Sequence, residues 1–190
     1  MTGGRPRNTD IDEAARTATR QLLVEAGWEG TTLSAVADRA GVSRPALYRR
    51  WPTKTHLVFD ALFGWSADAL PTSADEAPDG WLAAAIETSF ALFADPAVRA
   101  GAPGLLAVLA SDDDLRNTLW ESSARPVVER IEAYLDGGGD AAHRAALAQA
   151  VLAVIAGAPL FLELFGSDRV NPGARAALAA LVGALASPKP

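Results

Sequence analysis

The chain of 190 residues contains no cysteine and only two histidines. Without thiols it has no disulfide framework and no thiolate nucleophile or metal ligand, which fits a reducing compartment. His56 and His143 lie far apart in the sequence without a neighbouring ligand set, so we expect no metal site. No Gly-x-Ser-x-Gly motif occurs, and the run of glycines at 137–139 lacks the Lys-Ser/Thr of a phosphate-binding loop. We therefore expect no enzymatic activity and no cofactor.

Signals for export or membrane insertion are also lacking. Residues 1–8 are polar and have no apolar central region of a secretory signal. The apolar run Ala150–Leu162 contains Gly157 and Pro159 and is shorter than the roughly 20 residues that a membrane span needs. We predict that this run is a buried helix and that the protein is cytoplasmic, with no membrane partner.

Composition indicates a folded protein with an uneven charge distribution. Hydrophobic residues make up 49% of the chain, enough for a buried core, which argues against disorder and against a coiled-coil fibre. The net charge is −6, but residues 1–60 hold nine Lys or Arg against seven Asp or Glu. Because charges act over about 10 Å at ordinary salt, a local basic face on an acidic body remains compatible with DNA binding.

The pattern of apolar residues, caps and breakers predicts an all-α protein of about nine helices. A helix begins near Thr9 or Asp10 and ends at Gly27, where a left-handed conformation is expected. A polar, turn-rich segment at 72–79 is expected to separate an N-terminal unit from the remainder. The other predicted helices span 32–40, 43–51, 53–65, 80–94, 96–110 with a break near Pro103-Gly104, 112–135, 140–165 and 172–186.

Residues 33–51 have the spacing of a helix-turn-helix. A helix of about two turns is followed by the tight turn Gly41-Val42-Ser43 and a second short helix. Ala37 is small where the two helices must approach, and Gly41 permits a positive φ at the corner. The outward face of 44–50 remains free, and a helix of this size fits the major groove of DNA.

The segment at 31–54 reads TTLSAVADRAGVSRPALYRRWPTK and resembles the DNA-binding domain of the TetR (tetracycline-repressor-like) family, over about residues 11–65. Trp51 stands where most members carry Phe, an exchange that keeps an aromatic core residue. The resemblance implies a dimer that binds a palindromic operator and releases it when a small molecule enters the C-terminal domain. We therefore predict a flexible basic arm at 1–9, a helix-turn-helix domain at 10–53, a connecting helix at 54–71, and a ligand-binding and dimerisation domain at 72–190.

Arginines on the second helix of the motif are the predicted base-reading residues. Arg44 and Arg49 can each bridge O6 and N7 of guanine with two hydrogen bonds, although a solvated basic face is the alternative. Arg50 is a weaker candidate for this contact, the alternative being that it is simply exposed. Tyr48 resembles the family's phosphate-contacting tyrosine, the alternative being a structural role.

Phosphate contacts are predicted at helix starts and in the N-terminal arm. Thr32 and Lys54 begin helices, whose free amides attract phosphate, although either residue is also explained by capping or solvation. Ser43 is foremost a cap. Arg5 and Arg7 form an arm suited to an A·T-rich minor groove, or an idle tail. The predicted DNA-binding set is Arg5, Arg7, Thr32, Ser43, Arg44, Pro45, Ala46, Tyr48, Arg49 and Lys54.

The last two predicted helices suggest a homodimer interface. Small residues lie beside large apolar ones on these helices, which allows close packing over an apolar face. We expect two helices from each subunit to form a four-helix interface, with an intrachain core as the alternative. The small residues are Ala146, Ala153, Gly157, Ala176, Ala180 and Ala184.

Aromatic residues of the C-terminal part are the candidates for an effector site. Few polar residues accompany them, which favours an apolar or amphipathic small molecule, whereas ordinary core packing is the alternative. A second function from another class stays open: a small-molecule-binding or protein-interaction module that has lost operator binding. The candidate effector residues are Trp81, Phe90, Phe93, Trp120 and Phe161.

Overall fold

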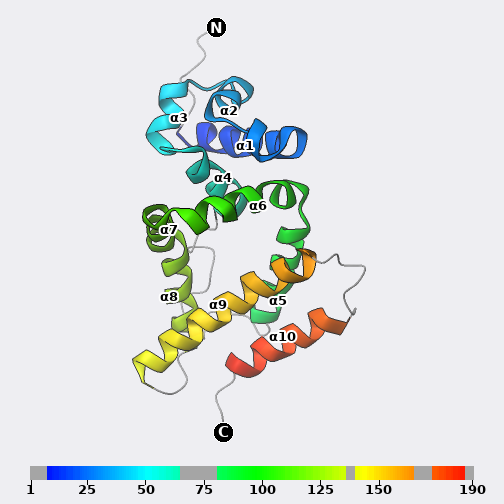
Figure 1. Cartoon of the computed structure of the whole chain (residues 1–190). Helices are drawn as coiled ribbons and strands as arrows, with labels where there is room; N and C mark the ends of the chain where they lie inside the picture. Colours follow the sequence, from blue (N-terminus) through cyan, green and yellow to red (C-terminus); the bar gives the residue numbers. More distant parts are fainter. Residues whose placement is uncertain (1–7, 65–80, 136–139, 165–172, 187–190) are drawn as a thin grey trace. The chain divides into compact units, whose positions relative to one another are not determined.

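The structure is a computed structural model that describes residues 8–64, 81–135, 140–164 and 173–186, and all regular elements within these ranges are helical (Figure 1). This confirms the all-α class. The arm with Arg5 and Arg7 and the connection at 72–79 lie outside the described residues. The α-helices are α1 (Asn8–Gly30), α2 (Leu33–Ala40), α3 (Arg44–Arg50), α4 (Lys54–Phe63), α5 (Trp81–Ala94), α6 (Pro96–Ser111), α7 (Asp113–Leu119), α8 (Arg125–Tyr134), α9 (Ala141–Leu164) and α10 (Gly173–Ala186).

The single helix predicted over 112–135 is interrupted once. It consists of α7, a π-helical segment at Trp120–Ala124, and α8. Pro126 lies in the first turn of α8 and has no N–H to donate, so the regular ladder is disturbed just before it and the chain takes a wider turn. With this stretch counted as one, the described residues form the nine helices expected.

The break predicted in the sixth helix is wrong. α6 runs continuously from Pro96 to Ser111 with Pro103 inside it. Pro103 is on the exposed side, whereas Ala102 and Leu105 beside it are buried. Packing of the buried side therefore holds the helix together across a residue that disfavours it locally.

The chain divides into two compact units. The first comprises residues 1–65 and 96–119, so it includes α6 and α7 besides the four N-terminal helices. In it α1 packs against α2, α4 and α6, and α2 packs against α3. Its N-terminal core is made of apolar side chains from α1 to α4 and the α3 terminus: Ala15, Ala18, Leu22, Leu33, Val36, Ala37, Leu47, Trp51 and Leu57. The division at residues 53 and 71 stays a prediction.

The second unit comprises residues 66–95 and 120–190. α5 packs against α9 and α10, and α8 packs against α9. The core between these helices includes Ile86 and Phe90 of α5, Ile131 of α8, Val151 of α9 and Val182 of α10. Each helix thus contributes one apolar face to a common interior.

α9 is less buried than its sequence predicts. The prediction of a buried helix over Ala150–Leu162 is wrong for most of this run, since 22% of the most apolar window of α9 is buried. Ala148, Val151 and Ile155 face the core, whereas Ala146, Ala153 and Gly157 are exposed on another face. By length and composition alone α9 could cross a membrane, with a mean hydropathy of 2.1. In the folded unit, α9 therefore has one buried face and one exposed apolar face.

Candidate nucleic-acid interface

The turn between α2 and α3 has the geometry expected of a helix-turn-helix. The Thr32 hydroxyl accepts a hydrogen bond from the Ala35 amide at 3.1 Å and caps α2. Gly41 ends α2 in the left-handed conformation, with φ 66° and ψ 28°. Any other residue would be strained there. The two predictions for Thr32 as a cap and for Gly41 as the corner are confirmed.

Ser43 occupies the N-cap position of α3 but does not cap it with its side chain. Its backbone carbonyl accepts hydrogen bonds from the amides of Ala46 and Leu47. Pro45 lies where the first amide donor to a capping hydroxyl would be, and it has no N–H. The prediction that Ser43 is foremost a cap is therefore wrong for its hydroxyl, and the residue lies exposed at the start of α3.

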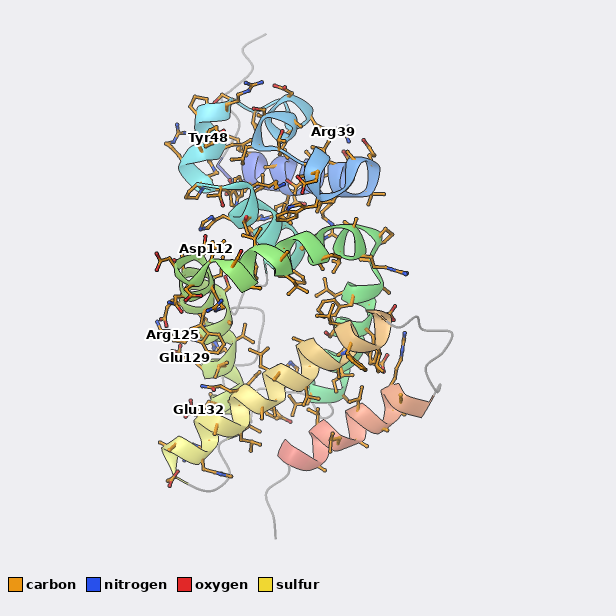
Figure 2. All side chains as sticks on the ribbon, in the orientation of Figure 1. Arg39, Tyr48, Asp112, Arg125, Glu129 and Glu132 are labelled. Carbon is orange, nitrogen blue, oxygen red and sulfur yellow. The ribbon has the colours of Figure 1, made fainter. Side chains whose placement is uncertain are left out.

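α3 has a buried side and an exposed side. Ala46 is 7% exposed and Leu47 is fully buried, and both face the protein interior. The neighbouring Tyr48 is 52% exposed, an unusual value for an aromatic residue, and it projects from α3 into solvent (Figure 2). Arg44 and Arg49 are exposed as well. Of the set predicted for DNA, Ala46 therefore has the least surface to offer.

The arginines of α3 differ in their surroundings. Arg44 forms an exposed ion pair with Asp38 of α2, its Nη2 lying 3.4 Å from the carboxylate oxygen. For Arg49 the described part of the chain shows neither a hydrogen bond nor an ion pair. Arg50 is turned inward, since it pairs with Asp12 of α1 and donates to the Ala46 carbonyl at 3.1 Å. The alternative that Arg50 is simply exposed is wrong, because the ion pair with Asp12 turns its side chain back over α1.

Asp60 of α4 joins three elements, a role that the sequence reasoning missed. Its Oδ2 accepts hydrogen bonds from Arg16 Nε of α1 at 3.0 Å and from Trp51 Nε1 at 2.9 Å. Trp51 is the C-cap residue of α3. Because it is only 6% exposed, its indole N–H needs a hydrogen-bond partner within the protein. The sequence signal was an acidic residue within the otherwise apolar run at 57–63 of α4, and its partners lie 44 and nine positions away.

Lys54, the first residue of α4, is folded onto the end of α1. Its Nζ donates to the Trp28 carbonyl at 2.9 Å and lies 4.3 Å from the centroid of a Trp28 ring. The side chain is partly exposed, so the ammonium is held in place rather than removed from solvent. The N-terminus of α4 is capped by Thr53, whose hydroxyl accepts from the His56 amide.

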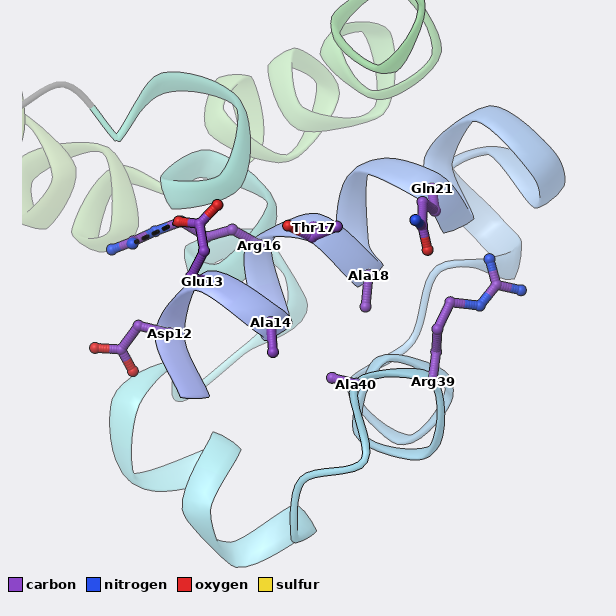
Figure 3. A pocket seen from close by; sticks show the side chains of 9 residues that line it. All are labelled: Asp12, Glu13, Ala14, Arg16, Thr17, Ala18, Gln21, Arg39 and Ala40. Carbon is purple, nitrogen blue, oxygen red and sulfur yellow. Dashed lines mark ion pairs between the residues drawn. The ribbon is translucent and has the colours of Figure 1, made fainter. Parts of the chain in front are cut away.

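A groove lies between α1 and α2 (Figure 3). Ala14, Ala18 and Ala40 contribute small side chains to it, and the polar residues Asp12, Glu13, Arg16, Thr17, Gln21 and Arg39 complete its lining. Both arginines are paired: Arg39 with Glu25 at 2.6 Å, and Arg16 with Asp60. The groove therefore offers an anion little uncompensated positive charge.

The five aromatic residues predicted for an effector lie in different surroundings. Phe90 and Phe93 are buried on α5, and Phe90 belongs to the core of the second unit. Trp81 packs against Tyr134 with ring centroids 5.0 Å apart. Trp120 is 39% exposed in the π-helical segment, and Phe161 is 58% exposed on α9. Their role toward a ligand stays a prediction, with Phe90 best explained by core packing.

A short exposed helix carrying arginines and a tyrosine, set on a buried α1–α2–α3 core by a left-handed glycine, defines a helix-turn-helix domain of the DNA-binding class. Residues 16–61 match the family model described as bacterial regulatory proteins, tetR family. Residues 16–61 therefore form a DNA-binding domain of the TetR family.

Individual proteins resemble this chain, one in sequence and two in fold. The HTH-type transcriptional regulator YdeS of Bacillus subtilis is 34% identical over 68 residues, which are 36% of this chain and 34% of that protein. The chain thus spans about a third of the length of this relative. NalD of Pseudomonas aeruginosa, the secondary repressor of the MexAB-OprM multidrug efflux pump, has a similar fold with a TM-score of 0.58 at 20% identity, covering 92% of this chain and 96% of NalD. The flavonoid-responsive regulator FrrA gives 0.55 at 19% identity, with 92% and 93% covered.

Proposed function

We propose that this protein is a homodimeric transcriptional regulator that binds a two-fold symmetric DNA operator through α3. The exposed side of α3 carries this proposal. Ala46 and Leu47 are buried in the core, whereas Arg44, Tyr48 and Arg49 are exposed on the opposite side of α3. The hydrogen-bond donors of these three side chains are therefore available to contact DNA. Thr32, Ser43, Pro45 and Lys54 are the proposed flanking contacts to phosphate and sugar. Arg5 and Arg7 extend the contact into a minor groove in the same proposal.

Dimerisation through α9 and α10 supports the symmetry of the operator. α9 exposes Ala146, Ala153 and Gly157, and α10 exposes Ala176, Ala180 and Leu181. Among the described residues, a Cβ at Gly157 would meet no atom within 4 Å beyond the adjacent backbone of its own helix. Two such small-residue faces can approach closely and bury each other, which removes apolar surface from water.

Repression with release by a small apolar or amphipathic effector is the proposed mode of action. NalD is a repressor and FrrA responds to flavonoids, and both share the fold of this chain over most of their lengths. The second unit offers mainly apolar and aromatic residues, with few polar groups to select a charged molecule. A regulator of this kind acts on chromosomal DNA, so its proposed location is the cytoplasm.

Selection of bound sequences from a random duplex pool, at two salt concentrations, tests the proposal. We expect enrichment of a two-fold symmetric sequence and an affinity that falls as salt rises. Sedimentation should give a particle of twice 19.8 kDa. If no duplex is enriched, operator binding is refuted and the small-molecule or protein-interaction module becomes the better account. A particle of 19.8 kDa at micromolar concentration would refute the dimer.

A further inference from the structure

Trp28 holds the ammonium group of Lys54 in two ways. Gly27, with φ 67° and ψ −170°, interrupts α1 just before Trp28, so the helix does not continue regularly through this residue. The Trp28 carbonyl accepts a hydrogen bond from Lys54 Nζ at 2.9 Å, and the same Nζ lies 4.3 Å from a Trp28 ring centroid. The carbonyl dipole and the negative face of the indole both attract the cation. A flexible lysine is thereby held at one place beside the start of α4.

Gly104 of α6 determines where this indole lies. A Cβ at Gly104 would fall 2.2 Å from Cγ and 2.3 Å from Cδ2 of Trp28, distances at which atoms overlap. The ring therefore occupies the space that any side chain at 104 would need. One turn earlier, a Cβ at Gly101 would lie 2.9 Å from Leu62 Cδ1 and 3.0 Å from Leu23 Cδ1, which are the ends of two buried leucine side chains. Only the Gly104 contact is made with the rigid ring that carries Lys54.

We propose that Trp28 is the positioning residue for a phosphate contact by Lys54, and that α6 sets the strength of this contact through the packing of Gly104 on the indole. The inference rests on the proposed function, since it assumes that the first turn of α4 meets DNA. An ammonium group has three N–H donors, and one of them binds the Trp28 carbonyl. The remaining donors are available for phosphate oxygens, already oriented by the indole. A displacement of α6 that moves the ring moves the ammonium with it.

Salt dependence of DNA affinity tests this coupling, measured with the full-length protein and the duplex obtained from the random pool. Lys54→Ala should reduce the slope of log K against log salt by about 1 for each bound subunit, because one phosphate contact is lost. Gly104→Ala should reduce it similarly, although it leaves Lys54 in the chain. Gly101→Ala is the matched control on the same helix and should keep the slope of the wild type. In a Lys54→Ala background, Gly104→Ala should have no further effect on the slope.

Two further measurements guard against misfolding as the explanation. Circular dichroism should show wild-type helix content for each variant. If Gly104→Ala does not fold, Trp28→Phe replaces it, since it keeps the backbone carbonyl but offers a smaller ring, and it should weaken DNA binding only when Lys54 is present. ¹⁹F NMR of protein labelled with 5-fluorotryptophan, with the Trp28 signal assigned by Trp28→Phe, should show that signal shifting in both Lys54→Ala and Gly104→Ala.

The outcomes separate this inference from the proposed function. If the wild type enriches no duplex, the proposed function fails and the inference fails with it. If the wild type binds its operator, but Gly104→Ala keeps the wild-type slope or acts equally with and without Lys54, only the positioning role of Trp28 is overturned. An unmoved Trp28 ¹⁹F signal in Lys54→Ala would likewise overturn the contact on which the role depends.

Discussion

Replacing Arg44 with alanine tests base reading most directly. The guanidinium is exposed on α3, and its one ion pair in the described structure joins it to Asp38, at 3.4 Å. A bidentate contact to guanine contributes about 1–3 kcal/mol of discrimination. The exposed ion pair between Arg44 and Asp38 contributes less than about 1 kcal/mol, so breaking it on DNA binding does not cancel the free energy of the contact with guanine. We expect Arg44→Ala to weaken operator binding by about 1–3 kcal/mol per half-site, while binding to random sequence changes little.

Fluorescence anisotropy with the operator and with a scrambled duplex, at one salt concentration, measures both effects. Arg116→Ala is the control, because it removes an equally charged and similarly exposed arginine from α7 of the same unit. It should leave the ratio of the two affinities unchanged. Asp38→Asn removes the carboxylate beside Arg44 and should strengthen binding to both duplexes, since a negative charge near phosphate is lost. Equal operator affinities for Arg44→Ala and the wild type, or equal losses on the two duplexes, would refute the base-reading role.

Three other substitutions address the fold and the assembly. Asp60→Ala leaves the N–H groups of Arg16 and Trp51 without their partner. We therefore expect the free energy of unfolding to fall by about 2–4 kcal/mol in urea titrations, and by less for Asp60→Asn. Equal losses for the two variants would contradict this reasoning. Gly41→Ala should cost about 1–2 kcal/mol in the same titration, because φ is 66° there, and an unchanged midpoint would show that the turn relaxes. Gly157→Arg should give monomers in sedimentation without loss of helix content, whereas an arginine at the exposed Ala91 of α5 should leave the dimer intact.

Local signals in the sequence were sufficient to predict the four helices α1 to α4. Thr32 and Gly41 act through their own side chain or backbone within a few residues, and both were identified correctly. Ser43 was read by the same rule and failed, because the rule ignores that Pro45 removes a donor. The predicted break in α6 failed for a different reason. Burial of Ala102 and Leu105 outweighs the local cost of Pro103, and burial depends on neighbours that no local rule includes.

The partners of the basic side chains could not be predicted from the positions of these residues along the chain. Arg44, Arg49 and Arg50 occupy one short helix, yet Arg50 reaches Asp12, which lies 38 positions earlier, and turns inward. Lys54 is held by Trp28, 26 positions away. A long side chain can reach any of several partners within a few ångströms, and which partners are near depends on how the helices pack.

The amino-acid sequence alone determined the class of the protein, a helical chain with a two-helix DNA-binding motif in its N-terminal part. This was possible because helix caps, turn residues and apolar spacing act over short distances along the chain. Tertiary packing decided which basic groups remain available, which face of α9 stays uncovered, and that α6 meets the first turn of α4 through a tryptophan ring. These features depend on contacts between residues distant in sequence, where charge and volume are matched only after the helices have come together.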